Sequence, residues 1–307
     1  EDSDRYFSRL PGRARSRVRE EVWNLAQMSA GMVVDVVTDS RLLAAELCLE
    51  EDPEHTPPGS DCSIDVYAHD GDRWGWVGLL GDLQRPITRG FVVRDGVPEK
   101  RHYRIHFPHA GLVKYLKLGF SADATVEPAA QPGFKPICCY GTSIVHGFSA
   151  SRPGMTMPAQ LSRRLQRPVF NLGFAGNARM DPELVGFFSE LDPAVYVIDC
   201  LPNMLPDLVR ERTGPFVRGL RASHPDTPIL LVENIVYQAT YMLADKRGGW
   251  GPKNDALRDE FLALEEEGIT GLHYLKGDNL LGADGEATVD GTHPSDLGFM
   301  RLTDSYE

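Results

Sequence analysis

The positions of hydrophobic and polar residues divide the chain into two halves with different periods. Between residues 29 and 120, apolar and polar residues alternate in short segments separated by turns. Such alternation is typical of half-buried strands, and strands without intervening helices favour an antiparallel β-sandwich. The turn at Asp70-Gly71 is the clearest hairpin, because glycine adopts positive φ at little cost. We expect strands over residues 32–38, 41–49, 63–69, 73–80, 90–94, 102–107 and 112–118.

After residue 136, apolar strand-like runs alternate with amphipathic helical segments. This order predicts a parallel sheet with helices on both faces, a three-layer α/β domain over residues 136–307. The Pro-, Gly- and Ala-rich segment 128–136 is predicted to link it to a sandwich domain of residues 1–127. The expected strands are 137–140, 169–172, 194–199, 228–233 and 272–275, and the expected helices are 158–166, 182–190 and 206–223, with a fourth inside 254–267.

Composition and charge exclude several classes of protein. The net charge of −12 argues against a nucleic-acid partner, since such binding depends on clustered Lys and Arg. The one basic run, residues 13–19, is interpreted as a solvated segment. No window approaches the roughly 18 uninterrupted apolar residues of a membrane helix, so no membrane partner is expected.

The five cysteines lack the paired spacing of a zinc site, and we interpret them as buried thiols of a reducing compartment. The first residues do not resemble a secretory signal, which favours a cytoplasmic location. The cysteines are Cys48, Cys62, Cys138, Cys139 and Cys200.

Three residues of the second half follow predicted strands directly. Ser143 comes after the strand 137–140 and a Gly-Thr turn, Gly176 lies beyond the strand 169–172, and Asn203 lies beyond the strand 194–199. Parallel sheets bind ligands at the carboxyl ends of their strands. We therefore expect these three residues to meet at one edge of the sheet.

Near the end of the chain, Asp290 precedes His293 by three residues. This spacing lets the carboxylate hold one imidazole nitrogen and leaves the other free to take a proton from a serine. Because a serine hydroxyl is a poor nucleophile without such a base, Ser143, His293 and Asp290 are predicted to form a catalytic triad. His146, three residues after Ser143, is a rival for the base. Its closeness to Ser143 in sequence does not supply an aspartate that would orient its imidazole.

Attack on an ester carbonyl also requires donors for the developing oxyanion. The backbone N–H groups of Ser143 and Gly176 and the side-chain amide of Asn203 are the predicted donors. Gly173 lies close to Gly176, and either glycine is also compatible with a simple turn.

At these residues the chain resembles the SGNH, or GDSL-like, hydrolase family. The resemblance rests on the block Gly141-Thr142-Ser143, Gly176, Asn203 and the Asp290-to-His293 pair, in the family's order. It implies a flavodoxin-like catalytic domain in which Ser143 is the nucleophile, Gly176 and Asn203 are oxyanion donors, and the pair completes the triad. The asparagine block departs from the family pattern, because it lacks the usual glycine and acidic residue around Asn203.

One subgroup of this family carries an N-terminal β-sandwich with a Gly-x-Asp-Leu-Tyr-like motif. Residues Ser63-Ile64-Asp65-Val66-Tyr67 resemble a divergent copy of it, and the segments 150–155 and 199–204 read much as in that subgroup. The resemblance implies a sandwich similar to carbohydrate-binding modules. The chain is also similar to two-domain acyltransferases of the family that place an aromatic acyl group, such as salicylyl, on a tetracycline-type polyketide.

Other side chains have both a structural and a functional interpretation. Arg152 and His146 are candidate substrate-binding residues, although a structural hydrogen-bonding role for Arg152 is also open. Alternation places His102 and His106 on a face with Arg104, opposite Tyr103, Ile105 and Phe107; we interpret this face as solvated and expect no metal there. Trp74 and Trp76 share one strand face and either pack or stack on a ligand.

The predicted function is serine-dependent acyl transfer through an acyl-enzyme. The acceptor is either a hydroxyl of a small natural product, as in an O-acyltransferase, or water, as in an esterase. The alternatives are a carbohydrate-ester (acetyl) esterase and a non-catalytic carbohydrate-binding or scaffold protein. We expect a small-molecule acyl donor and a hydroxyl acceptor as partners, with acyl-CoA as one donor, and no cofactor; the oligomeric state stays open.

Overall fold

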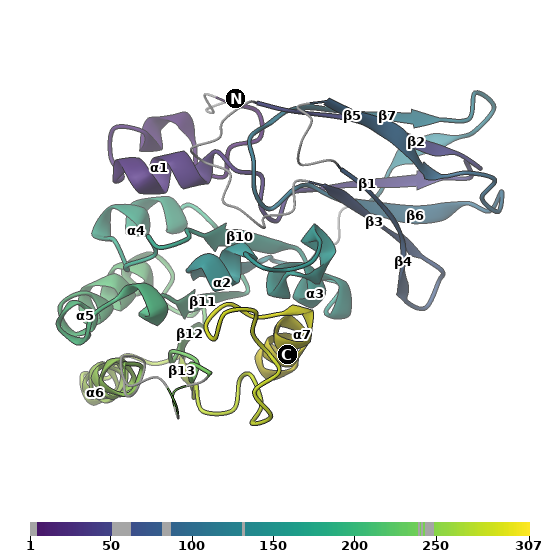
Figure 1. Cartoon of the computed structure of the whole chain (residues 1–307). Helices are drawn as coiled ribbons and strands as arrows, with labels where there is room; N and C mark the ends of the chain where they lie inside the picture. Colours follow the sequence, from purple (N-terminus) through teal and green to yellow (C-terminus); the bar gives the residue numbers. More distant parts are fainter. Residues whose placement is uncertain are drawn as a thin grey trace.

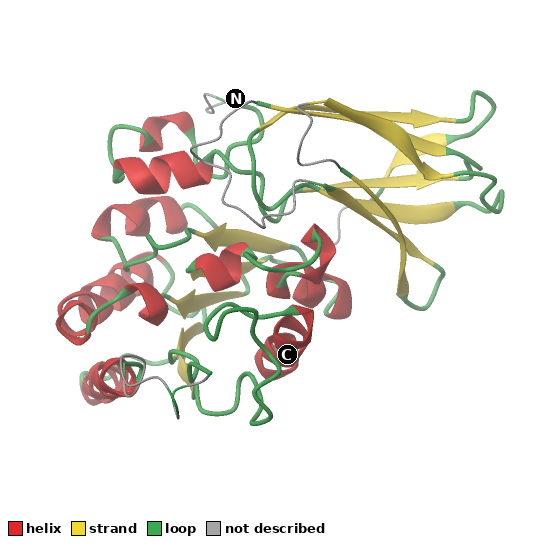
Figure 2. Cartoon of the chain, in the orientation of Figure 1, coloured by secondary structure: helices red, strands yellow, loops and turns green. Residues whose placement is uncertain are grey.

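The computed structural model describes residues 5–50, 63–81, 87–130, 133–238, 240, 242 and 249–307. It shows a β-sandwich above one edge of a larger α/β half (Figures 1 and 2). Among these residues, none of the helices is long and apolar enough to cross a membrane. Cys62 lies outside them, and the four other cysteines are buried and free.

The sandwich consists of two antiparallel sheets, as the alternation predicts. One has the strand order β4-β3-β6-β1-β8 and the other the order β5-β2-β7. Gly71, with φ of 111°, turns the hairpin between β3 and β4. The short β8 was not predicted; it pairs with β1 and takes up the start of the expected linker. The strands are β1 (Val33–Thr38), β2 (Leu43–Leu49), β3 (Ile64–His69), β4 (Trp74–Leu80), β5 (Ile87–Val93), β6 (Arg101–His106), β7 (Val113–Phe120) and β8 (Val126–Pro128).

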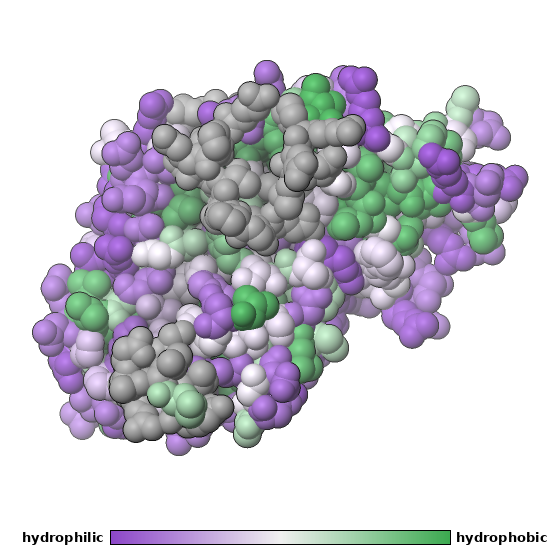
Figure 3. Space-filling view, viewed as in Figure 1, coloured by the Kyte–Doolittle hydropathy of each residue, from purple (hydrophilic) through white to green (hydrophobic). Residues whose placement is uncertain are grey.

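The core of the sandwich lies between its sheets. Tyr103, Ile105 and Phe107 face this core, as their alternation on β6 predicts. In the space-filling view hydrophobic residues remain visible on the sandwich, whereas hydrophilic residues predominate over the helices of the α/β half (Figure 3). The larger exposed apolar side chains of β4 and β5 are Trp76, Leu79, Ile87 and Phe91.

The α/β half contains one parallel sheet in the flavodoxin-like order β10-β9-β11-β12-β13. The predicted three-layer fold is confirmed. The strands are β9 (Ile137–Gly141), β10 (Val169–Gly173), β11 (Val195–Asp199), β12 (Ile229–Val232) and β13 (Leu272–Leu275). The helices are α2 (Ser143–His146), α3 (Met157–Arg164), α4 (Pro182–Phe188), α5 (Pro206–Ser223), α6 (Gly251–Glu266) and α7 (Asp296–Tyr306), with 3₁₀ turns η2 (Pro153–Met155) and η3 (Leu201–Asn203).

Side chains of β9, an inner strand of this sheet, alternate between two hydrophobic cores. Cys138 and Tyr140 enter a core formed with α4, α5 and α6, and Ile137 and Cys139 enter a core formed with α2, α3 and α7. A strand with both faces buried reads as a continuous apolar run, which is how it appears in the sequence.

The segment before the sandwich packs against the α/β half. It contains η1 (Gly12–Ala14) and α1 (Glu20–Ala26), and α1 lies beside α4 (Figure 1). Val22 and Trp23 of α1 join the same core as Tyr140. The basic run 13–19 is therefore not simply solvated: Arg19 donates to Asp181 at 3.0 Å.

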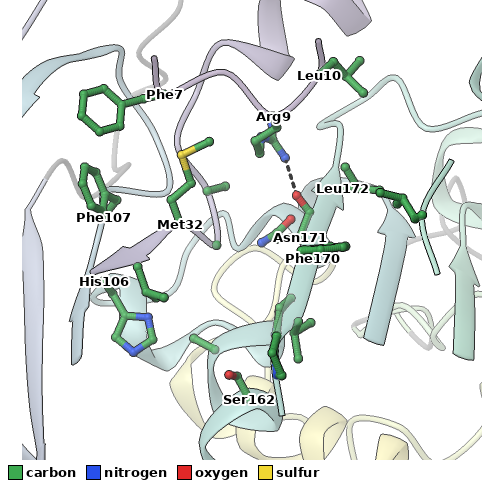
Figure 4. A pocket seen from close by; sticks show the side chains of 18 of the residues that line it. Phe7, Arg9, Leu10, Met32, His106, Phe107, Ser162, Phe170, Asn171 and Leu172 are labelled. Atoms are coloured by element: carbon green, nitrogen blue, oxygen red, sulfur yellow. Dashed lines mark hydrogen bonds between the residues drawn. The ribbon is translucent and has the colours of Figure 1, made fainter. Parts of the chain in front are cut away.

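Arg9 fastens this segment to the edge strand β10. Its guanidinium donates to the backbone carbonyls of Leu25, Met28, Asn171 and Gly173 at 2.6–3.1 Å, and the bond to Asn171 is drawn in Figure 4. Burial lowers the pKa of Arg9 to about 9. An internal cation with four carbonyl acceptors holds the end of β10, where a loop toward the predicted site begins.

A cavity of about 770 Å³ lies where this segment, β1, β6, α3 and β10 meet (Figure 4). Its walls are largely apolar, with Phe7, Met32 and Phe107 on one side and Phe170 and Leu172 on the other. Neither the predicted nucleophile nor the predicted base lines it.

Replacing Arg9 should destabilise the protein strongly. Arg9→Leu leaves buried carbonyls without a donor, and each unsatisfied group costs about 1–3 kcal/mol. We expect the free energy of unfolding in urea to fall by about 3 kcal/mol or more. Arg73→Leu, at a side chain 85% exposed, is the control and should change it by less than about 0.5 kcal/mol. Equal effects of the two changes would contradict this role of Arg9.

Candidate active site

The register of three strands brings the predicted residues to one edge of the sheet. Gly141 at the end of β9 pairs with Gly173 of β10 on one side and with Asp199 of β11 on the other. The three carboxyl ends are therefore level. Ser143 and Asn203 follow their strands within a few residues, so the loops that carry them start from neighbouring points.

Ser143 is the first residue of the short helix α2. Thr142 caps this helix by accepting a hydrogen bond from the N–H of Ile144. The turn requires a glycine before it, since a Cβ on Gly141 would lie 2.4 Å from the Val145 side chain and 2.6 Å from the Asp199 carbonyl. Local packing thus turns Ser143 out of the sheet edge, where it is half-buried.

The structure brings Ser143, His293 and Asp290 together. Ser143 Oγ lies 2.9 Å from His293 Nε2, and His293 Nδ1 lies 2.7 Å from Asp290 Oδ2. If the carboxylate accepts from Nδ1, the tautomer that results leaves Nε2 with a lone pair toward the serine hydroxyl. The geometry is that of a nucleophile with a base held by an orienting carboxylate.

Asp290 is oriented by its own loop. Its Oδ1 accepts from the backbone N–H groups of Thr292 and His293 at 2.9 and 2.7 Å, and the turn passes through Gly291 with φ of 86°. Burial alone would raise the pKa of Asp290, but the hydrogen bonds from His293 and Thr292 outweigh it and lower this pKa to about 2. The carboxylate is therefore charged at neutral pH.

The two neighbouring glycines have different structural roles. A Cβ on Gly173 would lie 2.1 Å from the backbone N of His146, so Gly173 permits close packing of β10 against α2. Gly176 has open space around it and φ of 70°, so its requirement is conformational. Asn203 Oδ1 accepts from the N–H of Ala178 at 3.3 Å, which leaves the Nδ2 donor of this amide for another partner.

His146 does not join this group. It is fully buried, its Nε2 lies 2.8 Å from the carbonyl oxygen of His109, and burial lowers its pKa well below the usual value. A side chain without exposed surface has no atom to offer a bound substrate. The expectation of a substrate-binding His146 is therefore corrected: the residue ends α2, and its side chain lies in the interior beside His109.

Arg152 binds the sandwich. Its Nη1 donates to Asp65 Oδ2 at 2.7 Å and to the Tyr67 hydroxyl at 2.5 Å, and its guanidinium lies 5.0 Å from the centre of the Trp76 ring. These contacts give Arg152 the structural hydrogen-bonding role, the second of the two roles considered for it. Both of its hydrogen-bond acceptors are side chains of the motif 63–67.

The face of β6 that was interpreted as solvated is covered by the α/β half. Arg104 is 8% exposed and donates to Ser162 of α3, while His106 is 3% exposed and lies 3.3 Å from Arg163 of α3. His102 binds Asp35. In the part of the chain that the structure describes, no three His, Cys, Asp or Glu side chains group as metal ligands.

Trp74 and Trp76 share this face and differ in exposure. The Trp74 ring packs against the His102 ring and the Arg104 guanidinium, two side chains of β6. Trp76 is 55% exposed, and its Nε1 donates to Asp65 at 2.8 Å.

Sequence reasoning did not single out Asp296. Its carboxylate accepts from the backbone N–H and the hydroxyl of Ser151, at 2.9 and 2.5 Å. The pair joins the loop after α2 to the segment that carries His293. The only sequence signal was the Ser295-Asp296 pair typical of a helix start, which α7 confirms.

Two family models together match nearly the whole chain. A model of the GDSL-like lipase/acylhydrolase family matches residues 134–307, and a model of the GxDLY N-terminus of SGNH-hydrolase-type esterases matches residues 1–126. Among curated protein sequences, none matches the chain.

Several solved structures are similar over nearly the whole chain. A protein of Bacteroides ovatus described as a GDSL-like lipase is 30% identical with a TM-score of 0.93, over 100% of this chain and 91% of that one. The salicylyl-acyltransferase of a tetracycline biosynthetic pathway is 19% identical with a TM-score of 0.80, over 99% and 90%. A family two carbohydrate esterase of Clostridium thermocellum, in complex with cellohexaose, is 14% identical with a TM-score of 0.64, over 90% of each chain.

Asp199, at the end of β11, should make stability depend on pH. It is buried, which raises its pKa from 3.8 to about 6, although the hydrogen bond from the Tyr306 hydroxyl at 2.9 Å opposes the rise. The folded state therefore holds this proton more tightly than the unfolded chain. Its contribution to stability is present below pH 4 and is lost as pH rises toward 6, by about 3 kcal/mol in total.

Asp199→Asn should remove this contribution. We expect the free energy of unfolding of the variant, relative to the original protein, to increase by about 3 kcal/mol between pH 4 and pH 7, measured by urea denaturation at each pH. Parallel stability curves for the two proteins would show that Asp199 has no raised pKa.

Proposed function

The chain belongs to the GDSL-like lipase/acylhydrolase family, and on this premise we propose that it is a serine-dependent acyl-transfer enzyme. The observation that carries the proposal is the pair of contacts that His293 makes, with Ser143 Oγ at 2.9 Å and with Asp290 Oδ2 at 2.7 Å. The geometry suits a reaction in which the hydroxyl loses its proton as it attacks.

In the first step, Ser143 Oγ forms a bond to the carbonyl carbon of an acyl donor while His293 Nε2 takes the hydroxyl proton. The Asp290 carboxylate supports the imidazolium that results, since its low pKa keeps it charged. Collapse of the tetrahedral intermediate breaks the bond to the leaving group, which receives the proton from His293. The product is an acyl ester of Ser143.

The oxyanion of this step needs donors at the sheet edge. We assign the N–H groups of Ser143 and Gly176 and Nδ2 of Asn203 to it. Support comes from the position of Ser143 at the start of α2, the open surroundings of Gly176, and the orientation of the Asn203 amide by Ala178. Loss of one such donor typically costs about 3 kcal/mol of transition-state stabilisation.

In the second step, His293 takes a proton from the acceptor as the acceptor oxygen bonds to the acyl carbon. The bond between this carbon and Ser143 Oγ then breaks, and His293 returns the proton to Ser143 Oγ. A hydroxyl of a small natural product gives O-acyl transfer, and water gives hydrolysis. The similarity to the salicylyl-acyltransferase motivates an aryl acyl group, with acyl-CoA as one donor. The chemistry on the enzyme is the same for both acceptors, so water exclusion and acceptor binding decide between them.

The second candidate is a carbohydrate-ester esterase. The exposed indole of Trp76 favours it, because an aromatic face beside polar groups suits a sugar ring. The fold similarity to the family two carbohydrate esterase is compatible with this candidate. A non-catalytic binding role is less well supported, since it gives no reason for the aligned triad.

Ser143→Ala should abolish turnover. We expect the rate of hydrolysis of an activated aryl ester to fall by at least about 10³-fold, and the acyl adduct seen by intact-mass spectrometry to disappear. His293→Ala should be about as severe, because the residues of a triad act as a unit. Ser305→Ala, at an exposed serine of α7, is the control. Undiminished activity of the Ser143 variant would contradict the proposal.

The partition of the acyl group should distinguish the two acceptors. The protein is given an aryl-CoA thioester or an aryl ester, with and without a polyhydroxylated aromatic acceptor, and the products are weighed. An acyltransferase should give acylated acceptor as the main product and a hydrolysis rate that falls when the acceptor is present. Hydrolysis alone, with acetylated saccharides as better substrates, would favour the carbohydrate esterase.

A further inference from the structure

A short loop of the α/β half is held between two carboxylates. The loop comprises Ser151 to Gly154 and follows α2, which carries Ser143 at its start. On one side Asp296, at the beginning of α7, accepts from Ser151; on the other side Asp65 of β3 accepts from Arg152 and Gly154. The second carboxylate belongs to the sandwich, so the two halves of the molecule meet at this loop.

Asp65 is fully buried and has three donors. Trp76 Nε1 donates to its Oδ1 at 2.8 Å, and Arg152 Nη1 and the Gly154 N–H donate to its Oδ2 at 2.7 and 2.9 Å. Such a set compensates the desolvation of a buried carboxylate. Gly154 has to be glycine, because a Cβ there would lie 2.4 Å from the Tyr67 ring and 2.5 Å from Asp65.

Two arginine side chains lie near the single carboxylate of Asp65. Arg152 binds it directly, and Arg163 of α3 lies with its guanidinium 3.9 Å from the centre of the Tyr67 ring and donates to the Gly154 carbonyl at 2.6 Å. Asp65 is the acidic side chain that these two cations share at the contact. Loss of its charge would leave two neighbouring cations with less compensation in a partly buried place.

The other end of the loop binds the segment that carries the predicted base. Ser151 binds Asp296 through its N–H and its hydroxyl, and Asp296 lies three residues after His293 on the same segment. Ser143 lies eight residues before Ser151. The loop therefore connects the segment of the nucleophile to the segment of the base, and its conformation is set from outside by the sandwich.

We propose that Asp65 is a positioning residue for acyl transfer: by holding the loop Ser151 to Gly154 it sets the place of His293 relative to Ser143. The inference rests on the proposed function and assigns the sandwich a part in the chemistry of the other half. It acts without contact to the substrate. A displacement of about 1 Å between reacting groups is enough to slow a reaction about 10²-fold.

The same face of the sandwich offers a matched control. Asp35 of β1 is a second buried carboxylate, bound to Arg104 at 2.8 and 2.9 Å and to His102 at 3.0 Å. Arg104 in turn donates to Ser162 of α3. This network joins the two halves as well, but it does not touch the loop after α2.

Asp65→Asn and Asp35→Asn are compared in the full chain. Each replaces one carboxylate oxygen by an amide donor that faces N–H groups, so both should lower the stability to urea. We expect Asp65→Asn to reduce kcat for a small aryl ester by about 10-fold or more, with KM changed by less than about twofold. The rate at which an organophosphonate labels Ser143 should fall to the same extent. Asp35→Asn should leave kcat within about twofold.

Ser151→Ala tests the same connection from its exposed end if the Asp65 variant does not fold. It removes the hydroxyl bond to Asp296, and kcat should fall about fivefold with KM unchanged. If either loop variant keeps kcat within about twofold of Asp35→Asn, the positioning role is wrong. If the original protein itself fails to react with the phosphonate at Ser143, the proposed function fails instead, so the two results are distinguishable.

Discussion

The level register of β10, β9 and β11 is the constraint on which the rest of the site depends. Gly141 pairs with Gly173 and with Asp199, so three chain segments leave the sheet at the same height. Parallel strands repeat their hydrogen bonds at fixed intervals, and a shift of one residue would turn every side chain to the other face. The two hydrophobic cores that receive alternate residues of β9 prevent such a shift.

Buried charged side chains connect the sandwich and the N-terminal segment to the α/β half. Arg9 binds carbonyls at the end of β10, and Asp65 binds donors of the loop after α2. Buried charges are costly unless they are fully paired, and here each has several partners. Because hydrogen bonds are directional, they specify position more narrowly than apolar contact does, which suits contacts that lie next to a site of chemistry.

Much of the fold and the candidate site was predictable, and the errors have a common cause. Alternation on β6 correctly placed Tyr103, Ile105 and Phe107 in the sandwich core, yet the opposite face was interpreted as solvated. Period shows which residues share a face but not what covers that face. Arg104 and His106 are covered by α3, an element distant in sequence. Arg152 was not expected to bind Asp65 for the same reason, because Asp65 lies in an element distant in sequence.

The sequence by itself determined the parallel sheet, the sandwich, and the order in which Ser143, Gly176, Asn203, Asp290 and His293 follow along the chain, because periodicity and short motifs are local properties. Only the tertiary structure decided that the side chain of His146 is buried, that Ser143 Oγ faces His293 at 2.9 Å, and that Asp65 binds Arg152 of the other half. The Ser143–His293 and Asp65–Arg152 contacts join residues 150 and 87 positions apart in sequence. Which side chains face each other there depends on how distant segments pack together, and no local pattern encodes this.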